Sequence, residues 1–214
     1  KIAEFVVDRL LNLVYLKIRG EGKAMLAVSS IPNAITYLSI IKKIYAEKCS
    51  QPQYAKYADA PIAIVYSDSQ GQPVCATFND GLSEEKVIGN FRQKKNGLII
   101  VVDKLQTGFD EPKLHTLFLD KEIRDINAIQ TISRVNRTCK YKTECHVIDC
   151  SWRNVNQANI NTAFRKFSGM TCSRFNPEQE AKEVARMYKA LLASKPYVDW
   201  FGRFQREWED AKFV

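Results

Sequence analysis

The sequence predicts an α/β fold, in which a parallel β-sheet is covered by helices on both faces. Three observations support this prediction. Apolar runs of about five residues recur along the first part of the chain, which is the usual length of a buried strand. Segments with apolar residues at helical spacing separate these runs. Strands that alternate with helices are typical of a parallel sheet with both faces buried.

The individual elements follow from local patterns. The first helix is expected from Ile2 to about Tyr15, because its apolar residues recur at helical spacing. Ser30 is the expected cap of the second helix, and Pro32 lies where a first helical turn tolerates proline. The polar run from Ser67 to Pro73 is expected to be a loop. Strands are expected at residues 23–30, 61–66, 97–103, 115–120 and 144–150, and further helices at residues 83–91, 125–137 and 156–167.

Length and composition restrict the class of protein. The 214 residues suffice for one domain with a helical annex, and the 45% hydrophobic and 26% charged content is that of an ordinary globular protein. No apolar run reaches the roughly 18 residues that a membrane-spanning helix needs. The first residues do not resemble a signal peptide, so a cytoplasmic protein is expected. The chain does not begin with methionine, and we interpret it as a piece of a longer protein.

The charge and the cysteines add two expectations. A net charge of +8, not gathered in one run, favours a folded basic patch that contacts a polyanion such as nucleic acid. The six cysteines form no C-x-x-C pair, and His115 and His146 do not complete a zinc-binding spacing. We therefore expect reduced thiols and no bound metal.

Three segments lie in or just beyond the loops that follow predicted strands. They are SSIPNA at residues 29–34, DKLQTGFDEP at residues 103–112 and IQTISRVNR at residues 129–137. In parallel α/β sheets, ligands bind beyond the carboxyl ends of the strands. This shared position makes all three segments candidates for function.

The third segment carries a possible phosphate-binding cluster. Gln130, Arg134 and Arg137 follow one another at spacings that place residues on one helix face. Guanidinium groups bind phosphate oxygens in a bidentate manner, so this face suits a phosphate. The alternative is a solvated basic face paired with Glu122 or Asp125.

The second segment displays polar groups in a tight loop. Thr107 offers a hydroxyl and a backbone N–H, Gly108 permits close backbone approach, and Asp110 accepts hydrogen bonds. Pro112 ends any continuing helix or strand. The alternative is a simple aspartate-capped turn.

Taken together, these segments resemble the second RecA-like domain of a superfamily 2 helicase or translocase. TGFDEP at Thr107 to Pro112 resembles motif V, QTISRVNR at Gln130 to Arg137 resembles motif VI, and MLAVSS at Met25 to Ser30 resembles motif IV. With LDK at residues 119–121 and VID at residues 147–149, the pattern is most similar to the restriction (R) subunit, the motor of type I restriction enzymes.

The resemblance covers residues 23–150 well and reaches weakly to residue 167. Thr131 and Ser133 depart from it, because small residues such as alanine or glycine are commoner at these positions. We expect a leading helix at residues 1–22, the RecA-like domain at residues 23–170 and a helical extension at residues 171–214. The apolar and aromatic stripes of this extension are expected to pack against a neighbouring domain.

The resemblance implies roles for the phosphate-binding cluster. ATP would bind between two RecA-like domains, and the first domain would hold Mg²⁺. Arg137 is then the candidate arginine finger, and Arg134 is a second contact that binds phosphate or orders the cleft. Gln130 would position nucleotide, water or a group of motif V.

The resemblance also implies contacts to DNA. Gly108 and Asp110 would couple the ATP site to the DNA groove. Thr107, Ser29 and Ser30 would contact the phosphates of double-stranded DNA, which positions a protein without reading sequence. Further expected partners are the first RecA-like domain and the nuclease domain of the same parent chain, and the methyltransferase and specificity subunits.

The sequence lacks several parts of a complete motor. No G-x-x-x-x-G-K-[ST] phosphate loop, magnesium-binding carboxylate box or nuclease motif occurs, so the isolated chain is expected to lack ATPase and nuclease activity. The alternatives left open are another superfamily 2 DNA motor, a non-enzymatic adaptor with the same fold and an unrelated α/β small-molecule binder. The two arginines argue against the adaptor, and SSIPNA is not the glycine-rich loop that the small-molecule binder would need.

Overall fold

The computed structural model describes residues 1–68, 71–104, 109–151, 153, 155–168, 185–186 and 189. The chain divides into two units, Lys1–Cys172 and Ser173–Val214, and every helix and strand named here lies in the first. The predicted helical extension at residues 171–214 lies outside the described residues, apart from three positions. Its helices and stripes, and the domain boundaries at residues 22 and 170, stay predictions.

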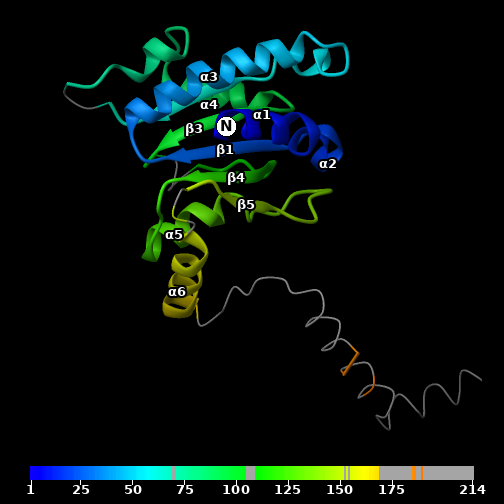
Figure 1. The fold of residues 1–214 in the computed structure, drawn as a ribbon, viewed down its shortest axis with the longest axis vertical. Helices are drawn as coiled ribbons and strands as arrows, with labels where there is room; N and C mark the ends of the chain where they lie inside the picture. Colours follow the sequence, from blue (N-terminus) through cyan, green and yellow to red (C-terminus); the bar gives the residue numbers. More distant parts are fainter. Residues whose placement is uncertain are drawn as a thin grey trace, which may run out of the picture. The chain divides into compact units, whose positions relative to one another are not determined.

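The core of the first unit is a five-stranded sheet in the order β2-β3-β1-β4-β5 (Figure 1). All four strand pairings are parallel, which confirms the predicted sheet. β1 lies at the centre, so the residues that follow it lie next to those that follow β3 and β4. The strands are β1 (Lys23–Val28), β2 (Ile62–Tyr66), β3 (Leu98–Val102), β4 (Leu114–Asp120) and β5 (His146–Asp149).

Helices cover both faces of the sheet, as predicted. Alternate residues of β1 belong to two separate apolar clusters: Leu26 packs in one, and Met25 packs in the other. The first cluster is closed by α1 (Ile2–Asn12) and α3 (Ile31–Cys49). The second is closed by α4 (Glu84–Gln93), α5 (Asp125–Ser133) and α6 (Asn156–Ser168). Short helical turns complete the unit: η1 (Val14–Leu16), α2 (Lys17–Gly20), η2 (Ala55–Tyr57) and η3 (Cys75–Phe78).

The leading segment is part of this core. The apolar face of α1 is buried through Val6, Val7, Leu10 and Leu11, all of which belong to the first cluster. The helix is amphipathic, and burial of this face stabilises it against the sheet. None of the helices in the described residues is long and apolar enough to cross a membrane.

The loop between β2 and α4 closes the outer edge of β2. Asn79 is buried, and its Oδ1 accepts a hydrogen bond from Ile64 N at 3.1 Å while its Nδ2 donates to Ile64 O at 2.8 Å. The amide thereby takes the place that another strand would occupy. Asp68 holds the same loop, because its Oδ1 accepts from Cys75 N at 2.8 Å.

A buried ion pair joins the central strand to the segment before β4. Lys23 and Glu111 are both buried, and Lys23 Nζ donates to Glu111 Oε2 at 2.7 Å and to Arg92 O at 2.9 Å. Glu111 Oε1 accepts from Lys113 N at 3.1 Å. Burial lowers the pKa of Lys23, while the hydrogen bond to Glu111 opposes this shift. The pair connects β1, the end of α4 and the loop after β3.

We expect the removal of either partner of this ion pair to destabilise the fold strongly. Lys23→Met or Glu111→Gln alone should lower the free energy of unfolding by about 3–5 kcal/mol, because the remaining partner stays buried without its counterpart. The double variant Lys23→Met/Glu111→Gln should lose less than the sum of the two single variants. Chemical denaturation of the 214-residue chain measures all three values. Strictly additive losses would contradict the proposed pairing energy.

Candidate functional site

The carboxyl ends of three neighbouring strands gather polar side chains. Ser29 and Ser30 follow β1, Asp103 follows β3, and Asp120 ends β4. Asp120 Oδ2 accepts from Tyr37 Oη at 2.6 Å. A hollow of about 340 Å³ lies beside the ends of β3 and β4. It is lined by Asp103, Lys121, Glu122, Ile123, Arg124, Asp125, Ile126 and Asn127.

The chain turns sharply where β3 ends. Asp103 has a left-handed backbone, with φ at 51°, and its carboxylate forms an ion pair with Lys121. Aspartate tolerates this conformation better than most residues, because its short side chain can bond locally. Lys104 then pairs with Glu84 at 2.5 Å. Residues 105–108 lie outside the described part of the chain, so the predicted roles of Thr107 and Gly108 stay predictions.

The helix with the predicted phosphate-binding cluster is shorter than expected. α5 ends at Ser133, and Arg134 is its C-cap residue. Ser133 Oγ donates to Gln130 O at 2.7 Å, and such bonds from serine and threonine compete with the backbone ladder of a helix. The expectation of one helix across residues 125–137 is therefore wrong at its end. Arg137 lies beyond the helix and does not share a helix face with Gln130 and Arg134.

Both arginines nevertheless contact the same short segment, Phe109 and Asp110. Arg134 Nη1 donates to Phe109 O at 2.8 Å, and its Nε donates to Gln130 O at 3.3 Å. Arg137 Nη1 forms an ion pair with Asp110 Oδ1 at 2.9 Å. The two segments that resemble motifs V and VI are thus joined directly, by one hydrogen bond and one ion pair.

The alternative of a solvated basic face named Glu122 or Asp125 as the partners of these arginines. Glu122 pairs with Arg124 at 2.6 Å, and Asp125 pairs with Lys166 at 3.2 Å, so the two carboxylates suggested as partners are engaged elsewhere. Arg137 pairs with neither of them.

The two guanidinium groups have different surroundings. Arg134 is only 9% exposed, and burial lowers its pKa, as does the positive charge of Arg137. The Arg137 side chain is 36% exposed, and that of its partner Asp110 is 57% exposed. The Nε of Arg137 is buried without an acceptor among the described residues. Arg134 is therefore suited to holding the loop, and Arg137 is suited to meeting an anion from outside.

The remaining predicted residues have local bonds. Gln130 is half-buried, and its carbonyl receives the bonds from Arg134 and Ser133. Ser30 Oγ accepts from Asn33 N at 3.3 Å, and Ser29 Oγ accepts from Asn33 Nδ2 at 3.0 Å. The prediction that Ser30 caps α3 is confirmed. A contact of either serine with DNA stays a prediction, as does a contact of Gln130 with nucleotide.

Sequence reasoning missed the groups that hold this region in place. Asn156 is fully buried; its Nδ2 donates to Asp149 Oδ1 and to Lys121 O, each at 2.9 Å, and its Oδ1 accepts from Ile123 N at 2.9 Å. This network joins the ends of β4 and β5 to the start of α6. The sequence did offer a signal for the buried Lys23–Glu111 pair. Lys23 is a charged residue at the start of an apolar strand.

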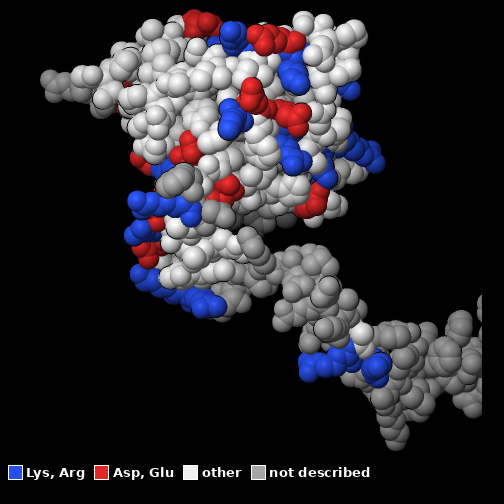
Figure 2. All heavy atoms as spheres, viewed as in Figure 1, with Lys and Arg blue, Asp and Glu red and all other residues white. Residues whose placement is uncertain are grey.

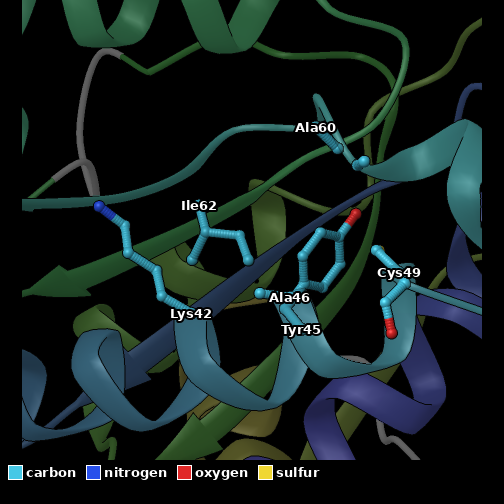
Figure 3. A pocket seen from close by; sticks show the side chains of 8 residues that line it. Lys42, Tyr45, Ala46, Cys49, Ala60 and Ile62 are labelled. Atoms are coloured by element: carbon cyan, nitrogen blue, oxygen red, sulfur yellow. The ribbon is translucent and has the colours of Figure 1, made fainter.

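A second hollow, of about 460 Å³, lies elsewhere (Figure 3). It is bounded by the second half of α3 and the start of β2, so it lies at the opposite end of the strands from the site. Tyr45, whose ring is seen in Figure 3, donates from its hydroxyl to Tyr57 O at 2.7 Å. None of the predicted site residues lines this hollow.

The part of the chain that contains Phe109, Asp110, Arg134 and Arg137 matches a known protein family. Residues 76–153 match the family described as type I restriction enzyme subunit R domain 3. A protein of Methanocaldococcus jannaschii, named as the type I restriction enzyme MjaIXP endonuclease subunit, is 31% identical over 135 residues. The alignment covers 60% of this chain and 12% of that protein. The MjaVIIP endonuclease subunit of the same organism is 24% identical over 149 residues, covering 64% of this chain and 13% of that protein.

Solved structures are similar in fold to most of this chain. Dbp5 of S. cerevisiae bound to RNA and ADP BeF3 has a TM-score of 0.47 and 17% identity, covering 86% of this chain and 41% of that chain. Mss116p DEAD-box helicase domain 2 bound to an RNA duplex has a TM-score of 0.46 and 13% identity. The match covers 83% of this chain and 60% of that chain. Scores below 0.5 carry no functional argument.

The chain spans only about an eighth of the length of the two curated relatives, at 12% and 13%. The family match nevertheless includes Phe109, Asp110, Arg134 and Arg137, the four residues that form the contact between the two motif-like segments. The resemblance to the R subunit of type I restriction enzymes is thereby confirmed, and residues 76–153 correspond to its domain 3.

Proposed function

We propose that this chain is the second motor domain of a type I restriction enzyme R subunit, and that it contributes to ATP-dependent translocation on double-stranded DNA before cleavage. The observation that carries the proposal is the contact of Arg134 and Arg137 with Phe109 and Asp110. A motor needs its nucleotide-binding and DNA-binding segments to move together, and this contact joins the two segments that resemble them.

In this proposal Arg137 is the arginine finger. ATP lies between this domain and the first RecA-like domain of the parent chain, which also holds Mg²⁺. Arg137 exchanges the carboxylate of Asp110 for phosphate oxygens, which is possible because both side chains reach the surface. A positioned arginine stabilises the charge that develops on the transferred phosphoryl group.

In this proposal, the ion pair of Asp110 with Arg137 depends on whether nucleotide is bound. When Arg137 leaves Asp110, the carboxylate loses its partner, and Asp110 and Gly108 are proposed to couple this change to the DNA groove. Arg134 keeps the loop attached meanwhile, because its bond to Phe109 O does not involve Asp110. Gln130 contributes by orienting Arg134 and by positioning nucleotide or water.

Surface charge supports contact with DNA. Lys and Arg side chains gather along the edge formed by α5 and α6 (Figure 2). Exposed basic residues of the segments around α5 and α6 are Arg124, Arg153, Arg165 and Lys166, of which Arg124 and Lys166 also form ion pairs. Such a patch binds phosphates without reading sequence. Thr107, Ser29 and Ser30 are proposed to contact the phosphate backbone of the DNA.

The proposed setting is a cytoplasmic complex. Its other parts are the first RecA-like domain and the nuclease domain of the parent chain, and the methyltransferase and specificity subunits. The isolated chain is proposed to be inactive, because its sequence has no phosphate-binding loop or nuclease motif. Another superfamily 2 motor or an adaptor with the same fold would lack the dependence on these subunits.

The first experiment is ATP hydrolysis by the complete R subunit with its partner subunits and duplex DNA. Arg137→Ala should lower DNA-stimulated turnover about 10³-fold or more, because the transition state loses its positive charge. Arg9→Ala, which removes an exposed arginine from α1, is the matched control and should retain turnover. Normal turnover by the Arg137 variant would refute the assignment, and absence of DNA-stimulated hydrolysis in the wild type would favour the adaptor.

The two arginines should also separate in their effect on stability. Arg134→Ala should lower the free energy of unfolding by about 2 kcal/mol, because Phe109 O loses a charge-assisted hydrogen bond. Arg137→Ala should change it by less than about 1 kcal/mol, since its ion pair with Asp110 is largely exposed. Thermal unfolding of the two variants side by side measures the difference, and equal losses would contradict the separate roles.

A further inference from the structure

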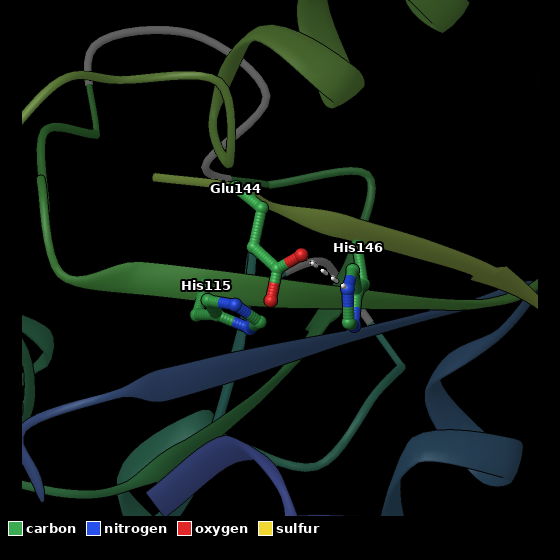
Figure 4. A group of neighbouring side chains, drawn as sticks. All are labelled: His115, Glu144 and His146. Carbon is green, nitrogen blue, oxygen red and sulfur yellow. Dashed lines mark ion pairs between the residues drawn. The ribbon is translucent and has the colours of Figure 1, made fainter. Parts of the chain in front are cut away.

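The two histidines of the sequence come together although they are far apart along the chain. His115 lies near the start of β4 and His146 opens β5, and the centroids of their rings are 4.8 Å apart in an edge-to-face arrangement. Glu144 completes the group, since its Oε2 lies 3.6 Å from His146 Nε2. Figure 4 shows the carboxylate between the two imidazole rings. One ligand atom of each residue lies within 4.8 Å of the other two.

His115, a member of this group, has an unmet bonding capacity. The residue is 1% exposed, and its Nδ1 lies 2.9 Å from Thr116 Oγ1. Its Nε2 is buried and has no partner among the described residues. An unsatisfied buried polar atom destabilises a fold, so a ligand at this nitrogen would remove a cost that the protein alone leaves in place.

We propose that His115, Glu144 and His146 bind a zinc ion. Two imidazole nitrogens and one carboxylate are an established zinc ligand set, and the fourth tetrahedral position is left to water or an anion. Bonds of roughly 2.0–2.2 Å place ligand atoms roughly 3.3 Å apart, so separations of up to 4.8 Å must close by up to about 1.5 Å. Glu144 and His146 provide this movement, because both side chains are partly exposed.

The charges around the group decide what a metal must displace. Lys17 Nζ now pairs with Glu144 Oε1 at 2.5 Å, and Lys17 is itself partly exposed on α2. A metal takes its place as the positive partner of the carboxylate while Lys17 turns to solvent. Lys142, the other nearby cation, is fixed by three backbone carbonyls: Pro112 O, Leu114 O and Val135 O.

The hydrogen-bond contact of His115 is compatible with a ligand role. Its Nδ1 lies against Thr116 Oγ1, and with the proton on Nδ1 this contact leaves the lone pair of Nε2 for a metal.

The location of the group indicates a structural role. It lies where β4 and β5 begin, whereas Ser29, Asp103 and Asp120 lie where strands end. β5 is a short strand at the edge of the sheet, paired on one side only, and a metal held by both strands would clamp it to β4. The expectation from the sequence that His115 and His146 hold no metal rested on spacing along the chain, which does not report contacts between strands.

Zinc alone is the probe that tests the site. The 214-residue chain, first treated with a chelator, is titrated with Zn²⁺ by calorimetry and then heated with and without the metal. We expect one bound equivalent and a rise in Tm that the chelator reverses, because a ligand that binds the folded state stabilises it. His146→Ala and Glu144→Gln should each bind at least tenfold more weakly and lose the rise in Tm. Circular dichroism without metal checks that both variants are folded.

A matched control separates this site from the cysteines. Cys145 lies between Glu144 and His146 on the chain and packs with the cluster on the other face of the sheet. Cys145→Ser should leave zinc affinity unchanged, and Co²⁺ bound to the wild type should show no thiolate charge-transfer band. Wild type that binds no zinc, or folded His146 and Glu144 variants that bind it as tightly as wild type, would overturn the proposal. So would a thiolate band that Cys145→Ser removes.

Discussion

The buried ion pair between Lys23 and Glu111 is the contact on which the geometry of the site depends. Glu111 directly follows Asp110, so the bond that holds Glu111 against the central strand also determines where Asp110 lies. The position of Asp110 in turn determines where Arg137 finds its partner. A charge buried at the start of β1 thus fixes the loop that follows the neighbouring strand β3. Such pairs stabilise little by themselves, but they are sensitive to geometry, which suits a positioning role.

The site assigns two tasks to two similar residues. Arg134 donates to a backbone oxygen in the interior, so it joins Phe109 to the end of α5. Arg137 bonds a carboxylate at the surface, so another anion can compete for it. One buried link therefore lies beside one exposed link. The match to domain 3 of subunit R includes both links, which is why a motor role is the best-supported proposal.

The sequence predicted the elements better than the contacts between them. All five strands and the cap at Ser30 were predicted, because apolar runs and capping residues are local signals. The early end of α5 was missed, since apolar spacing does not show that the Ser133 hydroxyl bonds to a helix carbonyl. The Lys23–Glu111 pair and the meeting of the two histidines were also missed. Both depend on strand order and register, which one sequence without its structure does not reveal.

Asn79 affects whether another chain can add a strand to the edge of the sheet. The outer edge of a parallel sheet offers unpaired N–H and C=O groups, and another chain can add to it as an extra strand. The amide of Asn79 already occupies both groups of Ile64, in the middle of β2. The loop between β2 and α4 therefore acts as a guard against strand addition and aggregation.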